Sequence, residues 1–177
     1  MGVPKLHKHE AESRGVKVFF AVITVSTSRF KKHIQGLEVS DESGDVAIEM
    51  ISNAGFKVVY RELIADNKQQ ILESLSTAIK KKCNVIIYIG GTGLTKSDIT
   101  VDVLKGVFEK EIVGFGELFR YLSYIEVGSP AMLSRATAGI YKNAVIFALP
   151  GSKNAVRLAL EKLILPEIGH IIYLINK

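Results

Sequence analysis

The sequence contains a single cysteine, Cys83, among its 177 residues, which rules out an internal disulfide. One free thiol fits a reducing compartment. Cys83 directly precedes an apolar run, so we interpret it as a small core residue. Apolar runs long enough to span a bilayer are also missing, because residues 16–25 are too few and Pro166 interrupts the C-terminal stretch. The first residues lack the apolar segment of a signal peptide, so we expect a soluble, cytoplasmic protein without membrane contact.

Signatures of nucleic-acid binding and of a histidine metal site are missing as well. The 23 basic and 18 acidic residues give a net charge of +5, which favours anionic ligands but is also ordinary for solubility. No basic stripe interleaved with aromatic residues is present, so we expect no nucleic-acid partner. His7 and His9 lie in a polar N-terminal segment without a third ligand. We interpret both as solvent-exposed side chains.

The glycine-rich residues 90–93, Gly-Gly-Thr-Gly, match neither of the two commonest nucleotide motifs. Lys96 comes too early for a Walker loop and stands where a dinucleotide fingerprint needs its third glycine. The preceding residues 85–89 are apolar and rich in β-branched side chains, which predicts a strand buried on both faces. Glycines then allow a sharp turn whose N–H groups can point at an anion. Asp98 follows closely, so the stretch predicts a phosphate-sized site beside a cation ligand.

Residues 16–177 are expected to form a single domain behind a flexible arm, residues 1–15. We expect strands at 18–25, 56–63 and 85–89, and a hairpin of 138–141 with 144–149. Between them we expect a polar loop up to residue 36 and helices at 41–53, 66–79, 101–108, 114–125, 129–135, 154–163 and 166–175. Strands that alternate with helices predict a three-layer α/β/α sandwich with a mostly parallel central sheet and a small β-hairpin.

Small, hydroxyl-bearing and acidic residues recur where the expected strands end. In parallel sheets, ligands bind outside the carboxyl ends of the strands. The residues at these ends are Ser26, Thr27, Asp66, Gly90, Gly91, Thr92, Gly93, Asp98, Pro150, Gly151 and Ser152. Their convergence on one edge is a stronger indication of a site than any single motif.

With these pieces placed, the chain resembles the MoaB/MogA family of molybdenum-cofactor biosynthesis proteins from about residue 18 to about residue 164. Six motifs occur in one order. They are Thr24-Val25-Ser26, Asp41-x-Ser43-Gly44, Gly90-Gly91-Thr92-Gly93 with Asp98, Gly114-Phe115-Gly116-Glu117, Leu133-Ser134-Arg135, and Leu149-Pro150-Gly151-Ser152. Each motif alone is modest, but their order is highly specific. Ser97, Val101 and Lys153 depart from the MogA-type pattern and indicate the MoaB-like branch.

The resemblance implies a molybdopterin-binding α/β domain that assembles as a homotrimer or as a hexamer, a dimer of trimers. Active members look like adenylyltransferases, which move AMP from Mg-ATP onto the terminal phosphate of molybdopterin and prepare it for a partner that inserts molybdate. By the same resemblance, Asp66 and Asp98 match the two catalytic acids, and residues 90–93 would cradle phosphate. Ser134 and residues 150–152 would line the pterin side. The resemblance also implies that Glu117 contacts a ligand or a neighbouring subunit and that Arg135 contacts a phosphate.

The chemistry of such a transfer agrees with these residue types. The attacking phosphate is already anionic near neutral pH, since its second pKa is about 6, so no histidine base is needed. Charge neutralisation and alignment are needed instead, and Mg²⁺ is commonly held by one or two carboxylates together with substrate oxygens. We therefore expect Asp98 to be the metal ligand and Asp66 to assist in placing metal or nucleotide.

Structural roles remain open for several of these residues. Asp66, followed by Gln69, and Asp98 could each cap a helix. Glu117 could favour a helix N-terminus, and Arg135 could form a surface ion pair. Asp41 and Ser43 could simply begin the first long helix.

Two readings compete with the transferase at the level of the whole chain. One is a MoaB-like protein that binds molybdopterin without catalysis, since some members of that branch lack adenylyl transfer. The other is an interaction domain of the kind found inside larger scaffolding proteins. Separately, the apolar residues 163–175 lead us to expect self-association.

Overall fold

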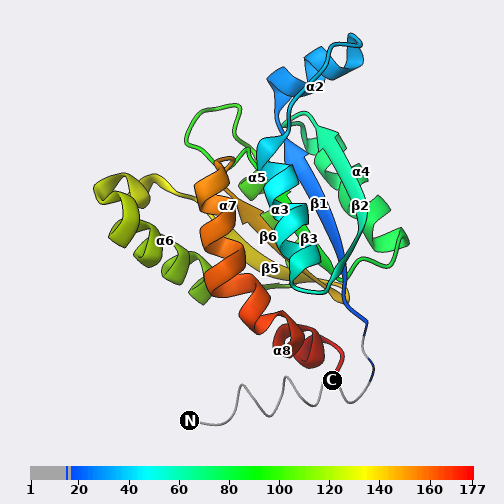
Figure 1. Cartoon of the computed structure of the whole chain (residues 1–177), viewed down its shortest axis with the longest axis vertical. Helices are drawn as coiled ribbons and strands as arrows, with labels where there is room; N and C mark the ends of the chain where they lie inside the picture. Colours follow the sequence, from blue (N-terminus) through cyan, green and yellow to red (C-terminus); the bar gives the residue numbers. More distant parts are fainter. Residues whose placement is uncertain (1–14, 16) are drawn as a thin grey trace.

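A six-stranded sheet forms the centre of the computed structural model, which describes residue 15 and residues 17–177 (Figure 1). The strand order is β2-β1-β3-β6-β5-β4. The strands are β1 Phe19–Val25, β2 Lys57–Ile64, β3 Val85–Ile89, β4 Lys110–Glu111, β5 Thr137–Tyr141 and β6 Ala144–Leu149. The first four strands in the order are parallel. β5 runs antiparallel to β6, and β4 runs antiparallel to β5, so β5 alone is reversed in this sheet. The expected α/β sandwich with a mostly parallel sheet and a hairpin is confirmed, and nearly all of the arm lies outside the described residues.

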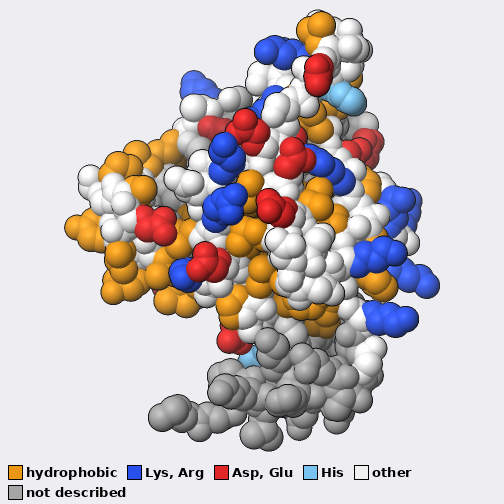
Figure 2. All heavy atoms as spheres, in the orientation of Figure 1, with side chains coloured by type: hydrophobic (Ala, Val, Ile, Leu, Met, Phe, Trp, Pro, Cys, Tyr) orange, Lys and Arg blue, Asp and Glu red, His pale blue; other side chains and the backbone are white. Residues whose placement is uncertain are grey.

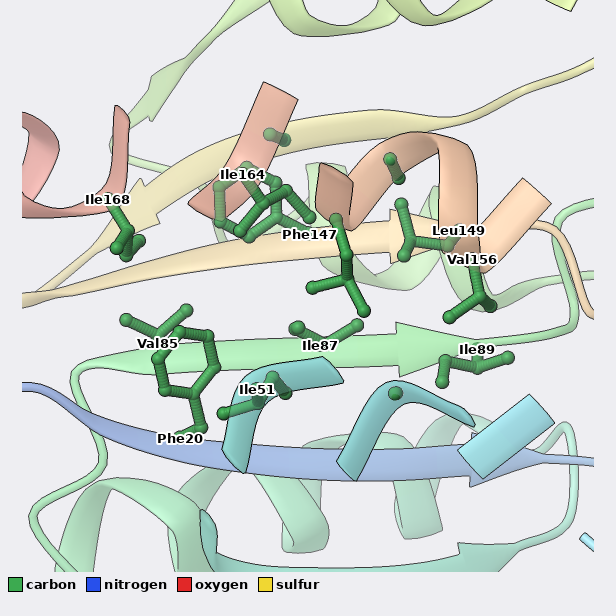
Figure 3. Packing of buried hydrophobic residues seen from close by; sticks show 14 of the residues in the cluster. Phe20, Ile51, Val85, Ile87, Ile89, Phe147, Leu149, Val156, Ile164 and Ile168 are labelled. Carbon is green, nitrogen blue, oxygen red and sulfur yellow. The ribbon is translucent and has the colours of Figure 1, made fainter. Parts of the chain in front are cut away.

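Side chains along the central strands alternate between two hydrophobic cores. On β3, Val85, Ile87 and Ile89 belong to one core, whereas Ile86 and Tyr88 belong to the other. The first core is covered by α3 Glu42–Asn53, α6 Val113–Val127, α7 Lys153–Ala159 and α8 Leu165–Ile175. Figure 3 shows its side chains meeting between β3, β6 and the helices α3, α7 and α8. The second core is covered by α4 Lys68–Lys80 and α5 Thr100–Lys105. All five β3 residues are buried, which explains the uninterrupted apolar run.

Three elements differ from the expectation. The polar loop after β1 is instead a helix, α2 Thr27–Ile34, which stands away from the body and buries none of its residues. Its first turn is capped by the Ser26 side chain, which accepts a hydrogen bond from the Arg29 N–H. Its apolar side chains are only Phe30 and Ile34, which share one face but are too few to predict a helix of two turns, so the cap was the main remaining signal. β4 has only two residues and pairs with β5, so no period could reveal it.

The third difference is that the last two helices are continuous. A π-helical turn, Leu160–Ile164, joins α7 to α8, and the Leu165 N–H donates to the Leu160 carbonyl, five residues back. Pro166 has no N–H to donate and its ring crowds the carbonyl four residues before it. The wider turn before Pro166 keeps the chain helical where the sequence indicated a break.

Exposed apolar side chains gather on α6 and on the following 3₁₀ helix, Ser129–Leu133, rather than at the C-terminus. Tyr121, Ile125 and Met132 are 62%, 64% and 76% exposed. Figure 2 shows these two elements as a field of hydrophobic side chains on the left of the molecule. In contrast, Ile164 and Ile172 of the C-terminal segment are buried in the first core. Among the described residues, no helix is both long and apolar enough to cross a membrane.

Candidate functional site

The glycine turn after β3 is packed between the ends of its neighbouring strands. The Gly90 N–H donates to the Leu149 carbonyl at the end of β6, at 2.9 Å. Gly90 and Gly91 have φ angles of 109° and 64°, which side chains disfavour. A Cβ on Gly90 would lie 2.2 Å from the Val25 carbonyl oxygen of β1, and one on Gly91 would lie 2.4 Å from Oδ2 of Asp66. Glycine is therefore required here by close approach as well as by φ.

Asp66 lies in contact with this turn and is held from two sides. Its Oδ1 accepts from the Thr100 hydroxyl at 3.0 Å, and its Oδ2 accepts from the Ile99 N–H at 3.2 Å. Its own N–H donates to Oγ1 of Thr27, the first residue of α2, at 3.1 Å. Burial raises the pKa of the Asp66 carboxyl, and the charge of Asp98 adds to the rise. Asp66 does not cap α4, because the side chain of Asn67 does.

Asp98 lies on the other side of the same turn. Its Oδ2 accepts from the Thr95 N–H at 2.9 Å and from the Thr95 hydroxyl. A Cβ on Gly93 would lie 2.7 Å from this oxygen. The N-cap of α5 is Ile99, without a side-chain bond, so Asp98 is not the helix cap that the sequence left open. Its Oδ1 accepts no hydrogen bond from any residue that the structure describes.

The two acids suit a magnesium ion held partly by substrate. In the described part of the chain, no three His, Cys, Asp or Glu side chains form a group able to hold a metal. Mg²⁺ is nevertheless often bound by one or two carboxylates, with water and phosphate oxygens completing its coordination. The Oδ1 of Asp98 offers such a ligand, whereas both oxygens of Asp66 already accept hydrogen bonds. The donor set therefore fits a metal that arrives with a nucleotide.

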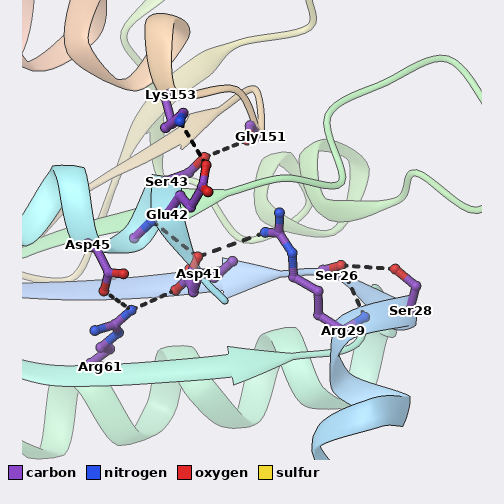
Figure 4. A network of polar contacts seen from close by, with 12 residues as sticks. Ser26, Ser28, Arg29, Asp41, Glu42, Ser43, Asp45, Arg61, Gly151 and Lys153 are labelled. Carbon is purple, nitrogen blue, oxygen red and sulfur yellow. Dashed lines mark hydrogen bonds and ion pairs between the residues drawn. The ribbon is translucent and has the colours of Figure 1, made fainter. Parts of the chain in front are cut away.

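The end of β6 is joined to the start of α3. Ser43 donates its hydroxyl proton to the Gly151 carbonyl at 2.8 Å, and Lys153 pairs with Glu42 at 2.7 Å (Figure 4). Ser152 caps α7 by accepting from the Ala155 N–H. Residues 150–152 therefore lie at the same edge as the glycine turn, and Gly151 and Ser152 already form hydrogen bonds within the fold.

Asp41 is the centre of a network that links β1, α2, α3 and β2. Its carboxylate accepts from the Thr24 hydroxyl at 2.7 Å, from the Gly44 N–H at 3.1 Å and from Arg61 at 3.0 Å. Arg29 approaches from α2, at 3.9 Å (Figure 4). Asp41 is buried and all its bonds are internal, which favours the helix-starting role over ligand contact.

A cavity of about 440 Å³ lies between α5, α6 and the start of β5. Ser134 and Arg135 line it, and Arg135 pairs with Asp102 of α5 at 2.6 Å. Thr137 pairs with Ala148 near the end of β6, so the cavity lies at the same sheet edge as the glycine turn. Glu117 is exposed on α6, and its neighbour Gly116 lines the cavity instead. A second cavity, of about 500 Å³, lies between β2 and α4 and contains none of the expected site residues.

The structure thus brings most of the expected residues to one edge. Ser26, Thr27, Asp66, residues 90–93 and Asp98 surround the turn, while Ser134 and Arg135 lie beyond α5. Sequence reasoning missed Thr100, which is fully buried against Asp66, and Arg120, which lines the cavity. For Arg120, its position four residues after Gly116 was an available signal, since such residues share a helix face.

The family model described as "Probable molybdopterin binding domain" matches residues 21–170. The chain belongs to the MoaB/MogA family. Molybdenum cofactor biosynthesis protein B of Bacillus cereus is 42% identical over 173 residues, which are 97% of this chain and 96% of that protein. A Methanocaldococcus jannaschii protein named probable molybdopterin adenylyltransferase is 46% identical over 156 residues, 86% of this chain and 91% of the relative.

Solved structures of the family agree in fold. The crystal structure of the tungsten cofactor synthesizing protein MoaB from Pyrococcus furiosus has a TM-score of 0.81 and 42% sequence identity. The match covers 91% of this chain and 98% of that one. The resemblance drawn from the six motifs is therefore confirmed, as is the fold that it implied. The roles of individual residues stay predictions.

Proposed function

We propose that the chain acts in molybdenum-cofactor biosynthesis by transferring AMP from Mg-ATP to the terminal phosphate of molybdopterin. Membership of the MoaB/MogA family supports the pathway, and the M. jannaschii relative's name supports the reaction. The observation that carries the proposal is the pair of acids on either side of the glycine turn. Asp66 touches Gly91 and Asp98 touches Gly93, so both carboxylates border the backbone that would hold phosphate.

In the proposed reaction, an oxygen of the molybdopterin phosphate attacks the α-phosphorus of ATP. The bond between the α-phosphorus and the bridging oxygen breaks, and pyrophosphate leaves with the electron pair. Mg²⁺, held by Asp98 with Asp66 nearby, would neutralise charge on the phosphates. The attacking phosphate needs no base, so the chain's tasks are to align two phosphates and to present Asp98 to the metal. The turn N–H groups and the clamp on Asp66 serve alignment.

The test is mass spectrometry of the products after incubation with molybdopterin, ATP and Mg²⁺. We expect an AMP–molybdopterin adduct from the wild type and none from Asp98→Asn. Asp45→Asn is the matched control, because Asp45 is exposed on α3 and, among the described residues, forms an ion pair with Arg61 alone. Equal turnover by Asp98→Asn would keep the reaction and discard the metal assignment.

A second function, molybdopterin binding without catalysis, is favoured by the names of the curated relatives, several of which are called biosynthesis protein B. The same mass-spectrometric assay distinguishes this binding function from the transferase function. Wild-type protein would then retain molybdopterin and form no adduct at any ATP concentration.

Self-association as a homotrimer or hexamer belongs to the same proposal. The apolar field on α6 and the 3₁₀ helix supports it, with Leu118, Tyr121 and Ile125 each more than half exposed. Burial of such a field between copies would remove a large apolar patch from water. A sedimentation experiment that gives a clean monomer at micromolar concentration would contradict it.

A further inference from the structure

The cavity between α5, α6 and β5 has more positive than negative side chains in its lining. Three cations line it, Lys105, Arg120 and Arg135, together with two carboxylates, Asp102 and Glu111. Lys105 pairs with Glu111 at 2.7 Å, and Arg135 pairs with Asp102 at 2.6 Å. Both carboxylates are therefore already matched by a cation. One positive charge, that of Arg120, is left over.

Arg120 is held in the cavity without a counter-ion. Its NH1 donates to the Ala136 carbonyl at 3.3 Å, and no carboxylate of the described residues lies within ion-pair distance. The bond from Lys105 lowers the pKa of Glu111 and the charge of Arg120 adds to this, but the Glu111 carboxylate already bonds to Lys105 and to the Thr137 hydroxyl. A partly buried guanidinium has lost some of its hydration, and an anion would restore the lost interactions.

Gly116 explains why the guanidinium lies here rather than in solvent. A Cβ on Gly116 would be 3.0 Å from NH1 of Arg120 and 2.8 Å from the Ala136 oxygen. The missing side chain therefore leaves the space that the guanidinium occupies. Ser134 adds a donor in the same lining, because its Oγ accepts from the Ala136 N–H and its hydroxyl donates to no residue that the structure describes. Arg120 and Ser134 therefore both place hydrogen-bond donors in the lining of the cavity.

The cavity and the glycine turn are connected through α5. Thr100 bonds to Asp66, and Asp102, two residues later, lines the cavity. Both also lie at the carboxyl edge of the sheet, since the start of β5 pairs with the end of β6. The acids and the cavity with Arg120 therefore border the same short helix at one edge of the sheet.

We infer that Arg120, with Ser134, binds a phosphate group of a substrate in this cavity. The planar fork of an arginine suits bidentate contact with phosphate oxygens, and its permanent charge matches the unpaired positive charge of the lining. The inference rests on the proposed function for the substrate's identity. The phosphate comes from the nucleotide or from the molybdopterin, and the chemistry of the contact is the same.

The first experiment measures binding of inorganic pyrophosphate by calorimetry at fixed ionic strength and without Mg²⁺, so that Asp66 and Asp98 cannot hold it through a metal. We expect Arg120→Gln to weaken binding about tenfold or more, since hydrogen bonds to charged groups contribute roughly 1.5–3 kcal/mol. Arg157→Gln is the matched control, because Arg157 is exposed on α7 and loses the same charge. Arg120→Lys should fall between, since it keeps the charge and loses the fork.

Titrations with ATP and with molybdopterin then identify the source of the phosphate. Weaker binding of ATP alone would assign the site to the nucleotide, and weaker binding of molybdopterin alone would assign it to the acceptor. Each result supports the inference. Equal pyrophosphate affinities for Arg120→Gln and Arg157→Gln, or no pyrophosphate binding by the wild type, would overturn it. None of these measurements requires AMP transfer, so an inactive protein that still binds phosphate through Arg120 would refute the reaction and leave this site standing.

Discussion

Replacement of Thr100 by valine should change the ionisation of Asp66 with little change in packing. Thr100 is fully buried, and valine has nearly the same shape and volume, so the substitution leaves little empty space. The hydroxyl that donates to Oδ1 of Asp66 at 3.0 Å is lost, while the Ile99 N–H remains. This bond lowers the pKa of Asp66, whereas burial raises it. The substitution therefore raises the pKa of Asp66 further above its ordinary value.

The size of the effect follows from the contact. A hydrogen bond to a charged group contributes about 1.5–3 kcal/mol, and the half-buried position of Asp66 favours the lower end. About 1.5 kcal/mol corresponds to roughly a tenfold change in the ratio of ionised to protonated Asp66. If ionised Asp66 is needed for AMP transfer, the acidic limb of the pH–rate profile moves to higher pH.

The same bond gives a prediction for stability. A carboxyl whose folded pKa is raised contributes stability at low pH that is lost as pH rises from its unfolded to its folded pKa. Thr100→Val enlarges that loss, so its destabilisation relative to wild type should be larger at pH 7 than at pH 4. Urea unfolding at the two pH values measures it, with Thr100→Ser as the control that keeps the hydroxyl. Equal destabilisation at both pH values, or a serine variant that behaves like valine, would refute the reasoning.

Two further substitutions test the edge on which the site is built. Gly91→Ala should lower the free energy of unfolding by at least about 2 kcal/mol in urea, because φ is 64° and the new Cβ would lie 2.1 Å from Oγ1 of Thr100. Gly114→Ala is the control and should be neutral or stabilising, because its Cβ meets nothing within 4 Å. Equal losses of stability in the two variants would contradict the close approach at Gly91. Asp41→Asn should cost about 2–3 kcal/mol, because it weakens several charge-assisted hydrogen bonds to a buried carboxylate. Asp45→Asn removes an exposed partner of Arg61 and should cost less than about 1 kcal/mol. Equal costs would count against a central role for Asp41.

The central strand and the glycine turn could be predicted from the sequence because the patterns that indicate them lie within a few consecutive residues. The β3 run is apolar at every residue and the turn that follows needs glycine, so both could be read without tertiary information. α2 could not be read in this way, since it has no buried face, and two-residue β4 exists only through its pairing with β5. Pro166 indicated a helix end because sequence rules describe α-helical turns, and a π turn follows a different spacing.

The residues of the candidate site likewise fall into those that local motifs predict and those that only tertiary contacts reveal. The motifs placed Asp66 and Asp98 near the glycines, because each follows a strand whose end could be located. Thr100 and Arg120 have ordinary surroundings in the sequence and gain their roles from partners 34 and 16 residues away in the chain. Such contacts appear only when the sheet brings the segments together.

The strand order places the two acids on parts of the sheet that differ in strength. Asp98 follows β3, which has a neighbour on each side, whereas Asp66 follows β2, an edge strand with partly exposed side chains. Edge elements open locally at lower free energy than central ones. The hydrogen bonds of Asp66 with Thr27, Ile99 and Thr100 therefore hold the end of the edge strand β2 in place against the segment that follows the central strand β3. Amide hydrogen exchange should therefore be faster along β2 than along β3. Local opening of β2 would move Asp66 first and so change its distance from Asp98.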